Sequence, residues 1–168
     1  MMGLDLTQFA HYVVTPTLKW LDPHVRYSLA AERLLLGTAW HESNGLRYLD
    51  QVDPGPDDPG PAVGVYQMEP ATHRDIWRNY LEYHDSLTAK IKLLRAPYPD
   101  PSAQLRTNLA YATAMARLQY YRHPAPLPEL DDLDGLAAYA KRYFNTRKGK
   151  ATVADYRKAL AHVATTLG

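Results

Sequence analysis

The sequence predicts an all-α fold formed by a single domain over residues 1–168. Apolar residues recur at four- and seven-residue intervals between residues 25 and 41, and residues 102–121 are rich in alanine and leucine. Clusters of proline and glycine separate the helical segments, and the pieces between these clusters are too short to be domains. With 46% hydrophobic and 22% charged residues, the chain has the composition of a globular protein with its own core.

The first expected helix covers residues 25–41 and places a carboxylate at its C-terminal end. The pair Asp22-Pro23 suits its start, since proline is favoured in a first helical turn. The pair Asn44-Gly45 suits its end, because both residues tolerate the left-handed backbone conformation. Glu42 is therefore expected at or near this end. The recurring apolar residues of the helix are Val25, Leu29, Leu36 and Trp40.

The other regular elements are also expected to be helices, separated by proline-rich breaks. Residues 53–61 are rich in proline and glycine and predict a loop with a short hairpin beside it. Prolines at 96–101 and 123–128 interrupt the chain again. The clearest helix is expected over residues 102–121, with a buried stripe of Leu105, Leu109, Ala112, Ala116 and Tyr120. Further helices are expected over residues 70–83, 87–94, 133–144 and 152–167.

The composition excludes several classes of function. The absence of cysteine excludes disulfides, thiolate metal sites and cysteine nucleophiles. No histidine pair has metal-ligand spacing beside a carboxylate, so no cofactor is expected, and His41 is expected to pack or to hydrogen-bond locally. A net charge of +1 gives no reason to expect a nucleic-acid partner.

The N-terminal segment predicts synthesis in the cytoplasm without a secretion signal. It carries an early Asp5 and lacks a basic start followed by a long apolar run. The densest apolar stretch, residues 34–40, is far shorter than the roughly 20 residues that a bilayer-spanning helix needs. Stable membrane insertion is therefore not expected.

Three separated segments carry candidate chemistry, and the first contains Glu42. This carboxylate follows Trp40 at the end of an apolar helix, where burial would favour the neutral form. Glycoside cleavage needs an acid that is protonated near neutral pH, because the leaving oxygen must receive a proton. Considered alone, Glu42 could equally be a surface residue near a helix end.

The second segment, residues 64–72, combines a flexible glycine with an amide. Gly64 allows close backbone approach, and Gln67 offers a donor and an acceptor that suit a sugar hydroxyl or N-acetyl group. The third segment, residues 136–139, ends in Tyr139 on an alanine-rich helix. Considered alone, the second could be a turn in which Tyr66 packs, and the third could carry a core tyrosine.

Taken in order, these segments resemble the lytic transglycosylases and goose-type lysozymes of the lysozyme-like superfamily. That pattern has Glu-Ser at a helix end, then a Gly-to-Gln stretch ending in Pro-x-Thr, then a helix with asparagine, and finally Ala-Tyr. Glu42-Ser43 fits the first part, and residues 64–72 fit the second closely. Asn108-Leu109 fits the third part loosely, with Ala112 where glycine is usual. Ala138-Tyr139 fits the fourth part loosely, with Ala140 where asparagine is usual.

The resemblance implies a two-lobed helical domain with a central cleft that cleaves peptidoglycan. The bond would be the β-1,4 linkage between N-acetylmuramic acid and N-acetylglucosamine, with peptidoglycan glycan strands as the partner. Glu42 would be the acid and base, and Tyr139 would lie across the cleft from it. The substrate-binding residues would be Ser43, Tyr66, Gln67 and Tyr139. With no secretion signal, such a chain would suit a bacteriophage endolysin or virion component, with phage virion or lysis partners.

Two mechanisms remain open within this interpretation. A lytic transglycosylase needs one carboxylate, whereas a hydrolase (muramidase) commonly needs a second one. The candidates for the second carboxylate lie on the loop before Gly64, which favours the transglycosylase; they are Asp50, Asp53, Asp57 and Asp58. The alternative from another class is a non-catalytic structural or wall-binding protein on the same scaffold. The basic residues 141–150 predict a solvated helix end and turn.

Overall fold

The computed structural model describes residues 2–52, 60–145 and 150–168. Every regular element in these ranges is helical, which confirms the all-α class, and their single isolated β-bridge joins Val63 to Met68. The elements are α1 (Leu6–Phe9), the π-helical η1 (Ala10–Val14), α2 (Thr15–Leu21), α3 (Leu29–Glu42), α4 (Pro70–Asn79), the 3-10 helix η2 (Leu81–Tyr83), α5 (Asp85–Leu94), α6 (Gln104–Thr107), α7 (Leu109–Tyr121), α8 (Leu133–Tyr143) and α9 (Val153–Leu167).

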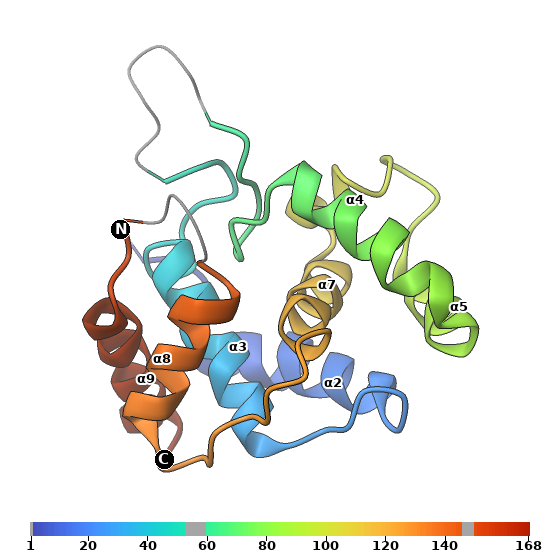
Figure 1. Cartoon of the computed structure of the whole chain (residues 1–168). Coiled ribbons are helices and arrows are strands. Elements are labelled where there is room, and N and C mark those ends of the chain that lie inside the picture. Colours follow the sequence, from blue (N-terminus) through green and yellow to red (C-terminus); the bar gives the residue numbers. More distant parts are fainter. Residues whose placement is uncertain (1, 53–59, 146–149) are drawn as a thin grey trace.

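Helix α7 forms the centre of the molecule. Its residues from 111 to 120 are all buried, and it contacts η1 and helices α2, α3, α4, α5 and α6. Figure 1 shows α4 and α5 on one side of α7, with α3, α8 and α9 on the other. The expected buried stripe is thus one part of a helix that is buried all round, because neighbours cover each of its faces.

Helix α3 ends where the sequence predicts but begins later. Ser28 accepts a hydrogen bond from the backbone N–H of Ala31 at 3.1 Å and caps the helix, so residues 25–28 precede it. At the other end, Asn44 and Gly45 have φ angles of 50° and 82°, which confirms the predicted stop after Glu42. The earlier start was wrong because the side chain of Ser28 outcompetes Asp22-Pro23 as the cap.

Helix α9 packs along α3 with close backbone approach. A Cβ atom on Gly37 would lie 2.6 Å from Cδ2 of Leu160, so the glycine leaves the space that this leucine occupies. A capping box of Thr152 and Asp155 fixes the start of α9. The C-terminal end of α3 is therefore held beside the first turns of α9 (Figure 1).

The single helix expected over residues 102–121 is divided into α6 and α7 at Asn108. The side chain of Asn108 accepts from the N–H of Tyr111 at 3.0 Å and caps α7, while its amide donates to the carbonyl of Leu94 at 2.8 Å. Asparagine favours such caps over helix interiors, because its side chain competes for backbone groups. The prediction of one continuous helix was therefore wrong.

The N-terminal helical segments, from Leu6 to Leu21, were not predicted. Pro16 lies in this stretch and cannot donate a backbone hydrogen bond, and the π-helical turn η1 lies directly before α2. The stretch therefore contains three consecutive helical segments, α1, η1 and α2, that were not expected. Within the described ranges, no helix is long and apolar enough to cross a bilayer.

The segment from Val63 to Met68 is a tight turn that packs against the α6 region. Gly64 has φ +79°, and a Cβ atom there would lie 2.1 Å from the carbonyl oxygen of Leu105. Reciprocal backbone hydrogen bonds of 3.1 Å join Val63 and Met68, a hairpin-like pairing beside the expected loop. Most of that loop, residues 53–59, lies outside the described residues.

Candidate functional site

Glu42 is the last residue of α3, as predicted, and its carboxyl group lies in a cluster contributed by α8 and α9. The hydroxyl of Tyr156 on α9 donates a hydrogen bond to its Oε1. Asn145, just after α8, also hydrogen-bonds to this carboxyl group, and Lys141 on α8 supplies a positive charge. Lys141 Nζ donates to Asn145 Oδ1 at 3.0 Å, so the amide nitrogen of Asn145 is the group that faces Glu42.

The environment keeps Glu42 close to half-protonated at neutral pH. Burial raises its pKa from 4.5 to about 7, against the opposing effects of Tyr156, Asn145 and Lys141. The C-terminal end of α3 carries a partial negative charge, which also disfavours the carboxylate. Glu42 is nevertheless only half-buried, so part of the residue stays accessible. A group of this kind can both donate and accept a proton near pH 7.

Tyr156 is a fixed hydrogen-bond donor. Burial and the charge of Glu42 both raise its pKa, so its hydroxyl stays protonated. Its ring packs against the ring of His41, with centroids 4.6 Å apart, and burial lowers the pKa of His41. These contacts hold the hydroxyl in place against the carboxyl group.

Sequence reasoning missed Tyr156 and Asn145. Tyr156 shares the buried face of α9 with Ala159, Leu160 and Val163, so helical spacing could have marked it as a polar tip on an apolar face. Asn145 supplies an asparagine amide to the acid although Ala140 stands where the resemblance would place one. Lys141 and Asn145 act on Glu42, so residues 141–145 are not a purely solvated helix end; residues 146–149 lie outside the described residues.

Two predicted substrate-binding residues, Ser43 and Tyr66, are fully buried. Ser43 Oγ donates to the carbonyl of Ala39 at 2.7 Å, and the hydroxyl of Tyr66 shares a 2.9 Å hydrogen bond with Thr113 on α7. The first contact closes the C-terminal turn of α3, and the second holds the turn before α4 against α7. Neither side chain presents a surface to a ligand in this arrangement, because local hydrogen bonds turn both inward.

Gln67 is half-buried, and both of its amide donors are engaged by the backbone. Nε2 donates to the carbonyls of Asp50 and Gly64, each at 2.9 Å, and Oε1 accepts from the N–H of Val52 at 2.9 Å. Its backbone has φ 49°, in the left-handed region. Gln67 therefore ties residues 50–52 to the turn, and its predicted contact with a substrate would use a remaining lone pair of Oε1.

Tyr139 lies in an aromatic cluster on the α8 side of α7. Its hydroxyl donates to the carbonyl of Ala125 at 3.2 Å, and its ring stacks on Tyr120 with centroids 5.7 Å apart. Burial raises the pKa of Tyr120, and Glu42 and Tyr139 both add to this effect. Tyr120 is therefore the side chain that links the surroundings of Glu42 to those of Tyr139.

The described candidate for a second carboxylate is engaged elsewhere. Asp50 is exposed and forms an ion pair with Arg106, at 2.9 Å from Nη2 and 3.0 Å from Nε. Asp53, Asp57 and Asp58 lie outside the described residues. Within the described ranges, no group of three histidine or acidic side chains is arranged to hold a metal ion.

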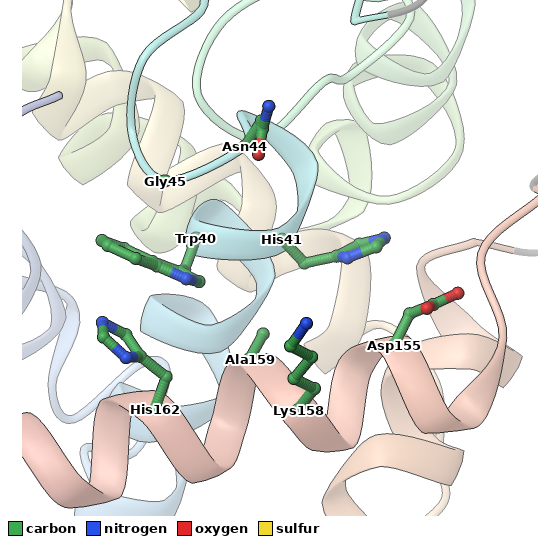
Figure 2. A pocket seen from close by; sticks show the side chains of 8 residues that line it. All are labelled: Trp40, His41, Asn44, Gly45, Asp155, Lys158, Ala159 and His162. Carbon is green, nitrogen blue, oxygen red and sulfur yellow. The ribbon is translucent and has the colours of Figure 1, made fainter. Parts of the chain in front are cut away.

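A surface cleft of about 290 Å³ lies between α3 and α9, next to the residues that surround Glu42 (Figure 2). Trp40 stacks on His162 at one end, with ring centroids 4.3 Å apart, and His41 points toward Asp155 at the other. His41 connects the cleft to Tyr156, which carries the hydrogen bond to Glu42.

Comparisons of the chain with protein-family models, with curated proteins and with solved structures find no match.

Proposed function

We propose that this protein cleaves the glycan strands of bacterial peptidoglycan, with Glu42 as the catalytic acid. The observation that carries the proposal is the environment of this carboxyl group: half-buried, hydrogen-bonded by Tyr156, and with a pKa of about 7. The order of the Glu-Ser, Gly-to-Thr and Ala-Tyr segments supports the same function through its resemblance to lytic transglycosylases and goose-type lysozymes.

In the proposed reaction, Glu42 first donates its proton to the oxygen that leaves the anomeric carbon. The C–O bond breaks with oxocarbenium-like character, and Glu42 becomes a carboxylate. Tyr156 and Asn145 then stabilise that charge through their hydrogen bonds, and Lys141 stabilises it electrostatically. The carboxylate afterwards removes the proton of the attacking hydroxyl, which returns Glu42 to its starting state.

The proposed mechanism is that of a lytic transglycosylase. Among the described residues, no other carboxylate shifts the pKa of Glu42, and Asp50 is bound to Arg106. With one positioned carboxylate, the simplest nucleophile is the C6 hydroxyl of the muramoyl residue itself, and the product is a 1,6-anhydro sugar. In this proposal the glycan strand lies across α7, with α4 on one side and α3 and α8 on the other. This placement follows the two-lobed fold that the resemblance implies.

The experiment is mass spectrometry of purified peptidoglycan after incubation with the protein. We expect 1,6-anhydromuramic products, lighter than the hydrolysis products by one water. In the Glu42→Gln variant, turnover should fall by roughly 10²- to 10⁴-fold, which is the usual contribution of general acid catalysis. Glu82→Gln, which removes an exposed carboxylate on η2, is the matched control. Reducing-end products would overturn the mechanism, and a Glu42→Gln variant that cleaves at the wild-type rate would overturn the function.

A further inference from the structure

Arg117 is a buried arginine without a hydrogen-bond or ion-pair partner among the described residues. It lies in the middle of the buried run of α7 and is 6% exposed. None of the hydrogen bonds or ion pairs of the described residues involves its side chain, although the guanidinium has five N–H donors. Leaving a buried charge unpaired costs several kcal/mol in proteins, so such a group normally has a partner.

The nitrogens of the guanidinium are not fully enclosed. Fully enclosed polar atoms without a partner occur at Nε of Arg33 and of Arg122, at Nδ1 of His73 and at Oε1 of Gln119, whereas no nitrogen of Arg117 is in that state. Each of its nitrogens therefore keeps some contact with the molecular surface. The side chain is otherwise buried in the core, since the whole residue is only 6% exposed.

Tyrosines surround the guanidinium. The guanidinium lies over the ring of Tyr121, 5.2 Å from its centroid. Burial lowers the pKa of Arg117, and the groups that oppose this effect are all tyrosines: Tyr139, Tyr121, Tyr80 and Tyr120. They come from α8, from α7 and from the C-terminal cap of α4.

Two of these tyrosines have unused hydroxyl groups. The hydroxyls of Tyr120 and Tyr139 are engaged by Thr38 and by the carbonyl of Ala125. In the described part of the chain, the hydroxyls of Tyr80 and Tyr121 have no such partner, and the charge of each affects the pKa of Arg117. One guanidinium and two phenolic donors, with no carboxylate among the groups acting on them, form a donor set without an acceptor.

We propose that Arg117, with the hydroxyls of Tyr80 and Tyr121, forms a binding site for a carboxylate of the substrate. A guanidinium binds a carboxylate through two parallel hydrogen bonds, and tyrosine rings pack against the apolar faces of sugars. Among the described residues, no second basic group figures among those that shift the pKa of Arg117, and a single cation matches a monoanion better than a phosphate dianion. The identity of this substrate rests on the proposed function: muramic acid carries a lactyl carboxylate, and peptide stems carry others, whereas N-acetylglucosamine carries none.

The site would act on the same bound strand as Glu42. Tyr120 is affected by the charge of Glu42, and its charge in turn affects Arg117. Tyr120 therefore lies within electrostatic range of both the acid and the guanidinium. A strand whose glycosidic oxygen meets Glu42 would place a neighbouring carboxylate at Arg117, so the site would distinguish muramic acid from glucosamine.

The test is a titration of the full chain with N-acetylmuramic acid, followed through the Arg117 Nε–H signal by NMR. N-acetylglucosamine serves as the probe without a carboxylate, and muramyl dipeptide as the probe whose carboxylate is on the peptide. We expect the carboxylate probes to shift the Arg117 signal and N-acetylglucosamine to leave it unchanged. The tighter carboxylate probe identifies the lactyl group or the stem as the source. Equal, weak effects of all three probes would overturn the site.

In the Arg117→Gln variant, affinity for the carboxylate probes should fall by roughly 10- to 100-fold, while N-acetylglucosamine binding stays unchanged. Arg157→Gln is the matched control, since it removes an exposed arginine that is paired with Asp134. The thermal midpoint of Arg117→Gln should match or exceed the wild type, because an unpaired buried charge is removed; a lower midpoint with unchanged probe affinity would make Arg117 structural. Binding of the carboxylate probes without cleavage of peptidoglycan would overturn the proposed function and leave this site standing. Cleavage of peptidoglycan without binding of the probes would overturn this site and leave the proposed function standing.

Discussion

The raised pKa of Glu42 has a consequence for stability that does not depend on any substrate. In the folded protein the carboxyl titrates near pH 7, whereas its ordinary pKa is 4.5. Between these values the folded state holds a proton that the unfolded chain has lost, so the free energy of unfolding falls as the pH rises through this window. The shift corresponds to about 3 kcal/mol, since each pKa unit is worth about 1.4 kcal/mol.

The test is the Glu42→Gln variant. Its glutamine side chain cannot ionise, so the variant does not lose this stability as the pH rises. Relative to wild type, the variant should gain about 3 kcal/mol of stability between pH 4 and pH 8, on top of a pH-independent offset. Urea unfolding at pH 4, 6 and 8 measures the difference, and Glu82→Gln reports the general effect of removing an exposed negative charge. A stability difference that stays the same at the three pH values would refute the burial of an ionisable Glu42.

Three further predictions follow from individual contacts. Tyr156→Phe removes a hydrogen bond that lowers the pKa of Glu42, so the alkaline limb of the activity profile should move up by about one pH unit; an unmoved limb would count against the contact. Gly64→Ala should cost about 2 kcal/mol or more in urea unfolding, because its Cβ would meet the carbonyl of Leu105, whereas Gly168→Ala, with a similar φ but open space, should cost far less. Asn108→Ala loses the cap of α7 and should cost about 1–2 kcal/mol by the same measurement; a variant as stable as wild type would show that the cap contributes nothing.

The sequence predicts those features of the fold that depend on residues close together along the chain. The end of α3 follows from two residues that accept the left-handed conformation, and the sequence therefore places Glu42 correctly. The break at Asn108 depends on the carbonyl of Leu94, which reaches that position only in the folded chain. The helices before residue 21 were not predicted, although Pro16 lies in the first turn of α2, where proline is tolerated.

The residues that surround Glu42 could not be predicted from the sequence for a different reason. Tyr156 lies 114 positions away along the chain, and it meets the carboxyl group because Gly37 lets α9 pack closely on α3. Periodicity can mark Tyr156 as buried, but it cannot tell which helix end its hydroxyl will meet. Gln67 illustrates the converse: a residue type suited to sugars turned out to have backbone partners. Its amide suits both roles, so the backbone contacts add a structural role and the contact with a substrate stays a prediction.

Two ionisable groups, Glu42 and Arg117, are both unfavourable for folding. Glu42 resists ionisation, and Arg117 is charged without a counter-charge, although filling either position with a neutral side chain would relieve the cost. Proteins commonly keep such costs where the missing partner is a ligand, because binding groups must stay unsatisfied until the ligand arrives. In the proposed function the two costs have one explanation. A muramoyl residue would bring an oxygen to be protonated by Glu42 and a carboxylate to neutralise Arg117, and both groups would be satisfied by the same bound strand.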